Sequence, residues 1–171
     1  MPDSMPAARG HLGELVKSLA SADGTQRKAA RVALVRAGVP AIPALLGALR
    51  STDRNTRWEA AKALGELPDA SAASGLVAAL TDEGPGVRWL AAEALSRLGR
   101  QALEPLLTAL VTESGSPWLR EGAHHVLLHL SRGDLEDVVE PVRIALDGVE
   151  PTTASAMAAH LLLEQLSHST S

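Results

Sequence analysis

Two histidines of the stretch EGAHHVLLHL (residues 121–130) have a spacing at which proteins bind metal ions. His125 and His129 stand four residues apart, which places them on the same face of a helix. His160 and Glu164 repeat this spacing 35 residues further along the chain. If the two helices align at that offset, three imidazoles and one carboxylate face each other, a ligand set for zinc or iron. An offset of 36 residues preserves the apolar stripe of the last helix better, pairs His160 with His124, and leaves the histidines solvated or packed.

The chain lacks the motifs that commonly mark a catalytic site. It has no cysteine, no GxxxxGKS/T phosphate loop, no GxSxG turn and no HExxH helix. No nucleophile stands beside a base in the sequence, and no pair of carboxylates marks a pocket. We therefore expect neither enzymatic activity nor a cofactor.

An Arg-Trp pair stands directly before an alanine-rich apolar stripe in TRWEAAKAL (56–64) and again in VRWLAAEAL (87–95). The stripe runs through the alanines, so Trp58 and Trp89 fall outside the core face, at one shared position on neighbouring helices roughly 8–10 Å apart. Exposed tryptophans often dominate the binding energy of an interface. The alternative is that each indole lies flat over the alanines of the next helix. Trp118 is outside this column, and we expect it to form a local hydrophobic clasp.

Charged residues of both signs surround the two tryptophans on the same predicted face. A mixed rim around an apolar centre suits a protein or peptide segment better than a phosphate backbone. The chain also has a formal charge of −4, whereas nucleic-acid binding needs a surplus of Lys and Arg on one face. We therefore predict a protein partner and disfavour nucleic acid. The predicted rim residues are Lys28, Lys62, Glu93, Arg97 and Glu121.

Four arginines recur along the chain at spacings of 30, 31 and 32 residues, namely Arg27, Arg57, Arg88 and Arg120. A period in this range is typical of stacked supersecondary units. The column could contact an anionic ligand. The interpretation that we favour is a structural ladder, in which each arginine, one turn into its helix, binds an acidic residue of a nearby turn. The candidate acids are Asp23, Asp53, Asp82 and Glu113.

A second apolar series alternates with the arginine-bearing segments. It comprises LVKSL (15–19), LLGAL (45–49), LVAAL (76–80), LLTAL (106–110) and VRIAL (142–146). Apolar residues recur at the period of an α-helix and show no sustained strand-like alternation, so we predict ten helices in five pairs. Favoured N-cap residues stand four positions before each column arginine, prolines follow two of them, and glycines or Pro68-Asp69 mark helix ends. The predicted caps are Asp23, Asp53, Gly84 and Ser116, the prolines are Pro85 and Pro117, and the glycines are Gly38 and Gly99.

These segments resemble the HEAT-like repeats, in particular the short type known from phycobilisome lyases. The shared features are an apolar helix such as AIPALLGAL, a turn that contains Asp, and a VRxxAAxAL helix, present as VRWLAAEAL and TRWEAAKAL. The resemblance covers residues 11–130 closely and residues 134–166 more loosely. It implies an all-α fold, a right-handed α-solenoid of about five helix pairs in which the second helix of each pair lines a concave surface.

We expect a flexible N-terminus over residues 1–10 and one repeat domain over 11–168. Its predicted units are 11–38, 39–68, 69–99, 100–131 and 134–168. The fifth unit has no arginine in the column and is expected to be a terminal cap with a polar outer face. An apolar content of 46% without Phe or Tyr suits closely packed helices of Ala, Leu and Val. Without cysteines, a membrane-length apolar run or a signal pattern, the chain is expected to be soluble and cytoplasmic.

The predicted function is that of a non-catalytic scaffold or regulatory module, a monomer or weak homodimer that binds a partner on the concave face. The family resemblance leaves two enzymatic alternatives. One is a metal-dependent enzyme around the histidines, although the His-Glu dipeptides of the HEAT-like di-iron hydroxylases are missing. The other is a DNA-binding protein of the HEAT-like glycosylase type, although no Asp stands beside the tryptophans. Phycobilisome-lyase activity would rest on the repeat alone.

Overall fold

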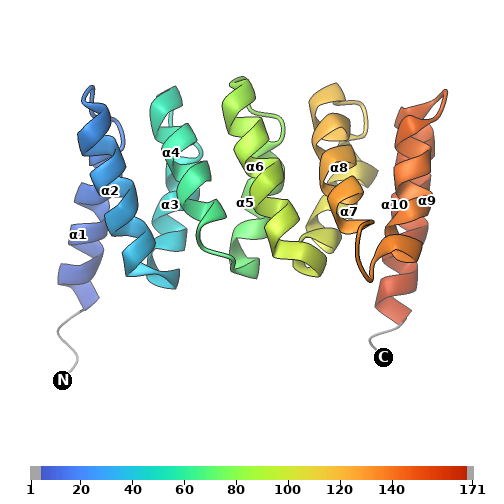
Figure 1. Cartoon of the computed structure of the whole chain (residues 1–171), viewed down its shortest axis with the longest axis horizontal. Helices are drawn as coiled ribbons and strands as arrows, with labels where there is room; N and C mark the ends of the chain where they lie inside the picture. Colours follow the sequence, from blue (N-terminus) through green and yellow to red (C-terminus); the bar gives the residue numbers. More distant parts are fainter. Residues whose placement is uncertain (1–4, 169–171) are drawn as a thin grey trace.

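The computed structural model describes residues 5–168, which form ten α-helices connected by short turns (Figure 1). Within this range there is no β-strand. The helices stack as five pairs in a helical solenoid, which confirms the predicted fold, while its hand stays a prediction. They are α1 (Met5–Ser18), α2 (Gly24–Ala37), α3 (Ile42–Ala48), α4 (Arg54–Gly65), α5 (Ala73–Ala79), α6 (Pro85–Leu98), α7 (Leu103–Glu113), α8 (Pro117–Leu130), α9 (Glu136–Asp147) and α10 (Pro151–His168).

The helices lie in two layers. Helices α1, α3, α5, α7 and α10 form the rear layer of Figure 1, here called layer A, and α2, α4, α6, α8 and α9 form the front layer, called layer B. In each of the first four pairs the chain runs through layer A and returns antiparallel through layer B. Successive B helices therefore present equivalent positions side by side, which places the repeated Arg and Trp positions in one layer.

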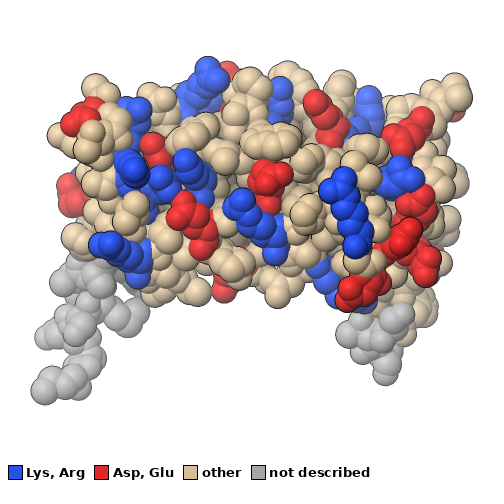
Figure 2. All heavy atoms as spheres, viewed as in Figure 1, with Lys and Arg blue, Asp and Glu red and all other residues tan. Residues whose placement is uncertain are grey.

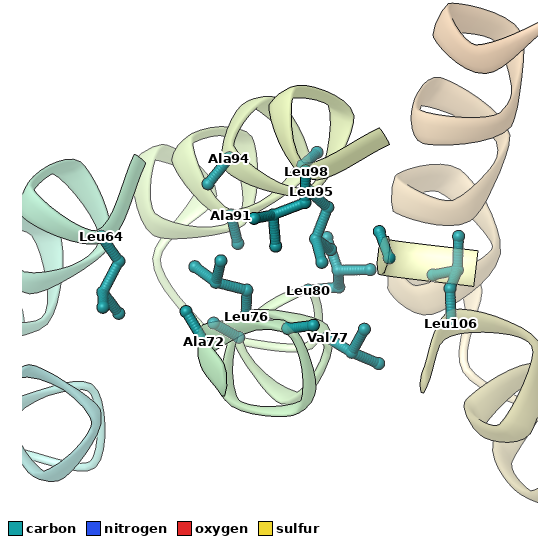
Figure 3. Packing of buried hydrophobic residues seen from close by; sticks show 14 of the residues in the cluster. Leu64, Ala72, Leu76, Val77, Leu80, Ala91, Ala94, Leu95, Leu98 and Leu106 are labelled. Atoms are coloured by element: carbon teal, nitrogen blue, oxygen red, sulfur yellow. The ribbon is translucent and has the colours of Figure 1, made fainter. Parts of the chain in front are cut away.

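Leucine and alanine side chains fill the space between the layers. Leu76 of α5 and Ala91 and Leu95 of α6 point into the space between these two helices (Figure 3), and all three are fully buried. Alanines such as Ala91 allow the two layers to approach closely, because they project little beyond the backbone. The core thus needs no large aromatic side chain.

The predicted helix starts are confirmed. The Asp53 carboxylate accepts hydrogen bonds from the hydroxyl and the backbone N–H of Thr56, at 2.6 and 2.7 Å, and these bonds lower the pKa of Asp53 below its ordinary value. Pro85 and Pro117 begin α6 and α8, where the missing N–H costs nothing. The N-cap residues of α2, α4, α6 and α8 are Asp23, Asp53, Gly84 and Ser116.

Three 3₁₀ turns carry the chain from layer B back to layer A, and we call them crossing turns. They span Val39–Ala41, Ala70–Ala72 and Gly99–Ala102. Each one ends on an alanine without exposed surface, namely Ala41, Ala72 and Ala102. Gly38 and Gly99 end α2 and α6, as predicted, with φ angles of 71° and 61° that favour glycine.

The fifth pair has its layers reversed, contrary to the sequence analysis. Helix α9 packs against α8 in layer B, and α10 packs against α7 and α9 in layer A (Figure 1). The linker 131–135 after α8 contains no 3₁₀ helix, so the chain stays in layer B and α9 runs antiparallel to α8. The expected placement of VRIAL (142–146) in the first layer and of His160 in the second was therefore wrong.

The N-terminal segment 1–10, which we expected to be flexible, falls partly outside the described residues. Its described part, from residue 5 onward, belongs to α1. Pro6 is favoured in the first turn of a helix, and Ala7 and Ala8 have high helix propensity, which explains the early start. Of the helices described, none has the length and apolar character needed to cross a membrane.

Candidate functional site

A groove of about 320 Å³ lies on layer B between α6 and α8. Two tryptophans line it, Trp89 from α6 and Trp118 from α8, and they are 58% and 45% exposed. Ala92 and Leu128 add apolar surface. The groove therefore combines an apolar lining with charged and polar residues at its edge, which are Arg88, Glu121, His124 and His125.

Trp89 is held at this groove by a histidine of the neighbouring helix. The centroids of the Trp89 and His125 rings are 4.9 Å apart, and the ring planes meet at 60°, an edge-to-face arrangement. His125 Nε2 lies 3.0 Å from Glu93 Oε1, one turn beyond Trp89 on α6. These contacts fix the indole yet leave most of its surface open to a ligand.

Trp58 occupies the same helix position as Trp89 but is only partly exposed. Lys62 Nζ lies 4.7 Å from the centroid of its ring, a cation–π contact. A Cβ atom added to Gly86 would lie 3.2 Å from Trp58 Cδ1, so the indole lies against the first turn of α6. Trp58 thus packs against a glycine of the next helix, whereas more than half of the Trp89 surface is exposed. The two tryptophans therefore do not form a platform of two equally exposed side chains.

Trp118 is more important to the groove than the sequence analysis anticipated. The Arg88 guanidinium carbon lies 4.6 Å from the centroid of its ring. The contact joins α8 to α6 of the preceding pair, so the expected local clasp is not what the structure contains. Arg88 and Trp118 both line the groove.

The remaining predicted rim residues are spread along layer B. Among the seven residues predicted to contact a partner, Trp89 and Glu121 line the groove and Glu93 supports it through His125. Arg97 donates to the carbonyl oxygen of Gly65 at 3.1 Å and so bridges α6 and α4. Lys28 is exposed on α2, further along the same layer.

All four column arginines bind backbone carbonyl groups, and Arg27 and Arg57 also pair with acidic side chains. Each donates from Nη1 to carbonyl oxygens five or six residues earlier, in the turn between the two helices of its own pair, and so fastens that turn to the B-layer helix. The acceptors are Ser21 and Ala22 for Arg27, Ser51 and Thr52 for Arg57, Asp82 and Glu83 for Arg88, and Ser114 for Arg120. Of the four acids expected as partners, Asp23 and Asp53 cap helices, and only Asp82 forms an ion pair with a column arginine in the described part of the chain.

Two buried ion pairs connect successive pairs of helices. Arg57 donates from Nε to Asp82 at 2.7 Å, and this hydrogen bond raises the pKa of Arg57 above its ordinary value. Arg31 donates from Nε to Glu59 at 3.0 Å and also contacts Glu66. Arg31, Arg57 and Glu59 are buried, so these residues belong to the fold and not to an open surface. Sequence analysis had not singled out Arg31.

The four histidine-cluster residues do not come together. His125 pairs with Glu93, while His160 lies 3.5 Å from Glu164 of its own helix, in layer A. His129 lies on α8 in layer B, away from α10. Neither predicted register applies, because α10 packs against α7. Across the described residues, no group of three or more His, Asp or Glu side chains is placed to hold a metal ion.

Comparison with known families decides the classification of this fold. The family model for HEAT repeats matches residues 12–96 and again residues 73–162. The chain belongs to the HEAT-repeat family. The matches extend over the reversed fifth pair, so the HEAT-repeat pattern survives in sequence where the order of the layers changes.

Solved structures support the HEAT-repeat architecture. The complex of CpcE and CpcF of phycocyanin lyase from Nostoc sp. PCC7120 is similar with 23% identity and a TM-score of 0.59, over 87% of this chain and 98% of that one. A HEAT-like repeats protein from the archaeon Thermococcus onnurineus NA1 has 20% identity and a TM-score of 0.50, over 89% and 65% of the two chains. An engineered protein has 22% identity and a TM-score of 0.51, over 93% and 81%. These similarities concern the fold. No curated protein matches the chain.

Two further residues of this HEAT-repeat surface were missed from the sequence. Gly122 lines the groove, and a Cβ atom there would lie 2.8 Å from Leu80 Cδ2, so the position must stay small. Asp147 of α9 lies 3.0 Å from His124 Nε2 and fixes that imidazole beside the groove. Gly122 could have been noticed as a glycine inside a HEAT-repeat helix. Asp147 could not, because its position depends on the reversed pair.

Proposed function

We propose that the protein is a non-catalytic HEAT-repeat module whose α6–α8 groove binds an extended segment of a partner protein. The observation that carries the proposal is the exposure of Trp89 and Trp118 around one apolar groove. Exposed tryptophans at a concave site are the side chains that most often supply binding energy. HEAT-like repeats suggest an interaction scaffold, and the groove gives that general role a specific location.

The volume and lining of the groove indicate what it binds. A space of about 320 Å³ lies at the lower end of ligand pockets and accommodates one or two large side chains. Apolar surface from Ala92 and Leu128 suits an aliphatic or aromatic anchor, and the polar side chains of Glu121 and His124 suit the polar backbone of the same segment. We infer that one apolar anchor of the partner inserts between Trp89 and Trp118.

The proposal assigns binding, and no reaction, to this surface. His125 faces Glu93 and His124 faces Asp147, but no serine, threonine or lysine nucleophile lines the groove with them. The similarity to the phycocyanin lyase complex concerns the fold and carries no reaction to this chain. Cytoplasmic location and a monomeric or weakly dimeric state stay predictions beside this function.

The proposal is tested by selecting peptides that bind the purified protein from a displayed library of random sequences. The selected peptides are expected to share an aliphatic or aromatic residue and to lose at least tenfold in affinity for Trp89→Ala, the loss of a hot-spot side chain. Met157→Ala is the matched control, since Met157 is 63% exposed on α10 in layer A, away from the groove. Equal binding to Trp89→Ala and the wild type, with circular dichroism showing both folded, would refute the proposal.

A further inference from the structure

Charge is distributed unevenly along layer B. Helices α2 and α4 carry seven Lys or Arg residues and one acidic residue between them. Helices α8 and α9 carry two Arg and five acidic residues. Figure 2, which views this layer, shows the basic side chains gathered over α2 and α4 and the acidic ones over α9. The groove between α6 and α8 lies between these two regions.

Part of this charge is available to a partner. Lys28 and Arg54 at the basic end, and Glu121 and Glu136 toward the acidic end, are exposed and form no ion pair with any residue in the range 10–168. Buried arginines such as Arg57 are already neutralised by carboxylates. The four exposed groups therefore keep charges that a bound segment can complement.

We propose that the partner segment is dipolar, with acidic side chains over α2 and α4, an apolar anchor in the α6–α8 groove, and basic side chains over α8 and α9. The proposal rests on the proposed function and assigns the chemistry of its partner. Charge complementarity of this kind selects partners and fixes their register on a surface. A nucleic-acid strand does not fit, because its phosphates would meet the carboxylates of α8 and α9.

The spacing of the helices sets the spacing of the charges in the partner. Packed helices lie roughly 8–10 Å apart, so α4 and α9 each lie about 12–15 Å from the middle of the groove. An extended chain advances about 3.4 Å per residue. The acidic residue that meets α4 and the basic residue that meets α9 therefore stand about four residues from the anchor, on opposite sides, in either chain direction. An acidic residue that meets α2 stands about two to three residues further out, because α2 lies one helix spacing beyond α4.

Five fluorescein-labelled peptides of about 13 residues test this inference by anisotropy. All share a central Leu-Trp-Leu, and the flanks are acidic then basic, basic then acidic, both acidic, both basic, or both Ser and Gln. At low salt, at least one dipolar peptide is expected to bind roughly five- to tenfold more tightly than the neutral one, the effect of several exposed charge pairs. Added salt is expected to remove the difference.

A charge reversal on the protein supplies the second arm. The double variant Lys28→Glu, Arg54→Glu leaves five basic and three acidic residues on α2 and α4, so the net charge of these helices falls from 7 − 1 = +6 to 5 − 3 = +2. The advantage of the dipolar peptide over the neutral one is therefore expected to shrink in this variant. Lys17→Glu is the control, because Lys17 lies on α1 in layer A. Circular dichroism and thermal melting confirm that the variants are folded.

The outcomes separate the two proposals. If the neutral peptide binds in a Trp89-dependent manner and the flanks have no effect, the dipolar inference is wrong and the groove remains. If a uniformly charged peptide binds the wild type best, or a single-stranded oligonucleotide competes, the partner chemistry is wrong. If no peptide binds, or binding does not depend on Trp89, the proposed function fails and the inference fails with it.

Discussion

Replacing Arg57 with lysine keeps the charge and removes the planar fork on which the second and third helix pairs depend. The Arg57 guanidinium donates to Asp82 Oδ2 and Oδ1 at 2.7 and 3.2 Å, to Glu83 at 2.7 Å, and to the carbonyl oxygens of Ser51 and Thr52 at 2.9 and 3.2 Å. A lysine ammonium is a single point with three donors and cannot span these acceptors. Asp82 would be left buried with an incomplete partner.

The magnitude follows from which of these bonds are protected from water. The bond to Glu83 counts for little, because that side chain is 78% exposed. The two bonds to Asp82 join side chains that are only 8% and 9% exposed, and a hydrogen bond to a charged group there contributes about 1.5–3 kcal/mol. Since lysine retains part of this interaction, Arg57→Lys is expected to cost about 2–4 kcal/mol of unfolding free energy. The melting temperature then falls by roughly 5–15 °C for a chain of this size.

Urea denaturation followed by circular dichroism measures this cost, with Arg120→Lys as the matched control. Arg120 occupies the same column, but its side-chain hydrogen bond within the described chain is to the carbonyl oxygen of Ser114, so its replacement is expected to cost less than about 1.5 kcal/mol. Two results contradict the view that the Arg57–Asp82 hydrogen bonds join the second and third pairs. One is an unfolding free energy of Arg57→Lys within about 0.5 kcal/mol of that of the wild type. The other is a loss of unfolding free energy equal to that of Arg120→Lys.

Three further substitutions test other parts of the structure. Asp53→Ala removes the N-cap of α4 and is expected to cost about 1 kcal/mol at pH 7. Because folding lowers the pKa of Asp53, this contribution is present above about pH 4 and is lost as the pH falls through the lowered pKa of the folded state. Urea titrations of the wild type and Asp53→Ala at pH 7 and pH 3 measure the cost at each pH. An equal cost at the two pH values contradicts this account. Ser155→Ala is expected to raise the stability by about 1 kcal/mol, since its buried hydroxyl has no hydrogen-bond partner among the described residues; a lower melting temperature in calorimetry would speak against this. Gly122→Ala is expected to cost about 1 kcal/mol net and to weaken peptide binding, because the new methyl group meets the buried Leu80 side chain. Gly13→Ala is expected to stabilise α1, because its new methyl group meets nothing within 4 Å. The urea midpoints of the two variants should therefore move in opposite directions.

Much of the fold could be predicted from the sequence because its signals are local and recur. Each N-cap, from Asp23 to Ser116, stands four residues before its arginine and depends only on its own turn. The fifth pair could not be placed in the same way, since the helical pattern of α9 and α10 is compatible with either layer. The deciding signal was an absence: the linker 131–135 has no counterpart of the buried Ala41, Ala72 and Ala102 of the crossing turns.

The candidate site was predictable only in part, because it depends on contacts between neighbouring repeats as well as on local signals. The position of Trp89 follows from helical periodicity, which indicates that it lies outside the core stripe. The difference between Trp58 and Trp89 depends on what the next helix presents, which is Gly86 to one indole and His125 to the other. Trp118 was discounted because it is outside the sequence column, yet its side chain, two residues before Arg120 on α8, reaches Arg88 of α6. Contacts between neighbouring repeats do not follow the repeat register.

The reversed fifth pair limits how such an array can lengthen by duplication of its own gene segments. A unit from the first three pairs begins in layer A and ends in layer B, and the crossing turn after it delivers the chain to the starting point of another unit of the same kind. A copy of the fifth pair inserted between two regular units would enter through layer B and leave through layer A, and each later helix would fall into the wrong layer. Duplication can therefore add units before α9 without disturbing the stacking, whereas the pair α9–α10 can be inherited only as a single copy.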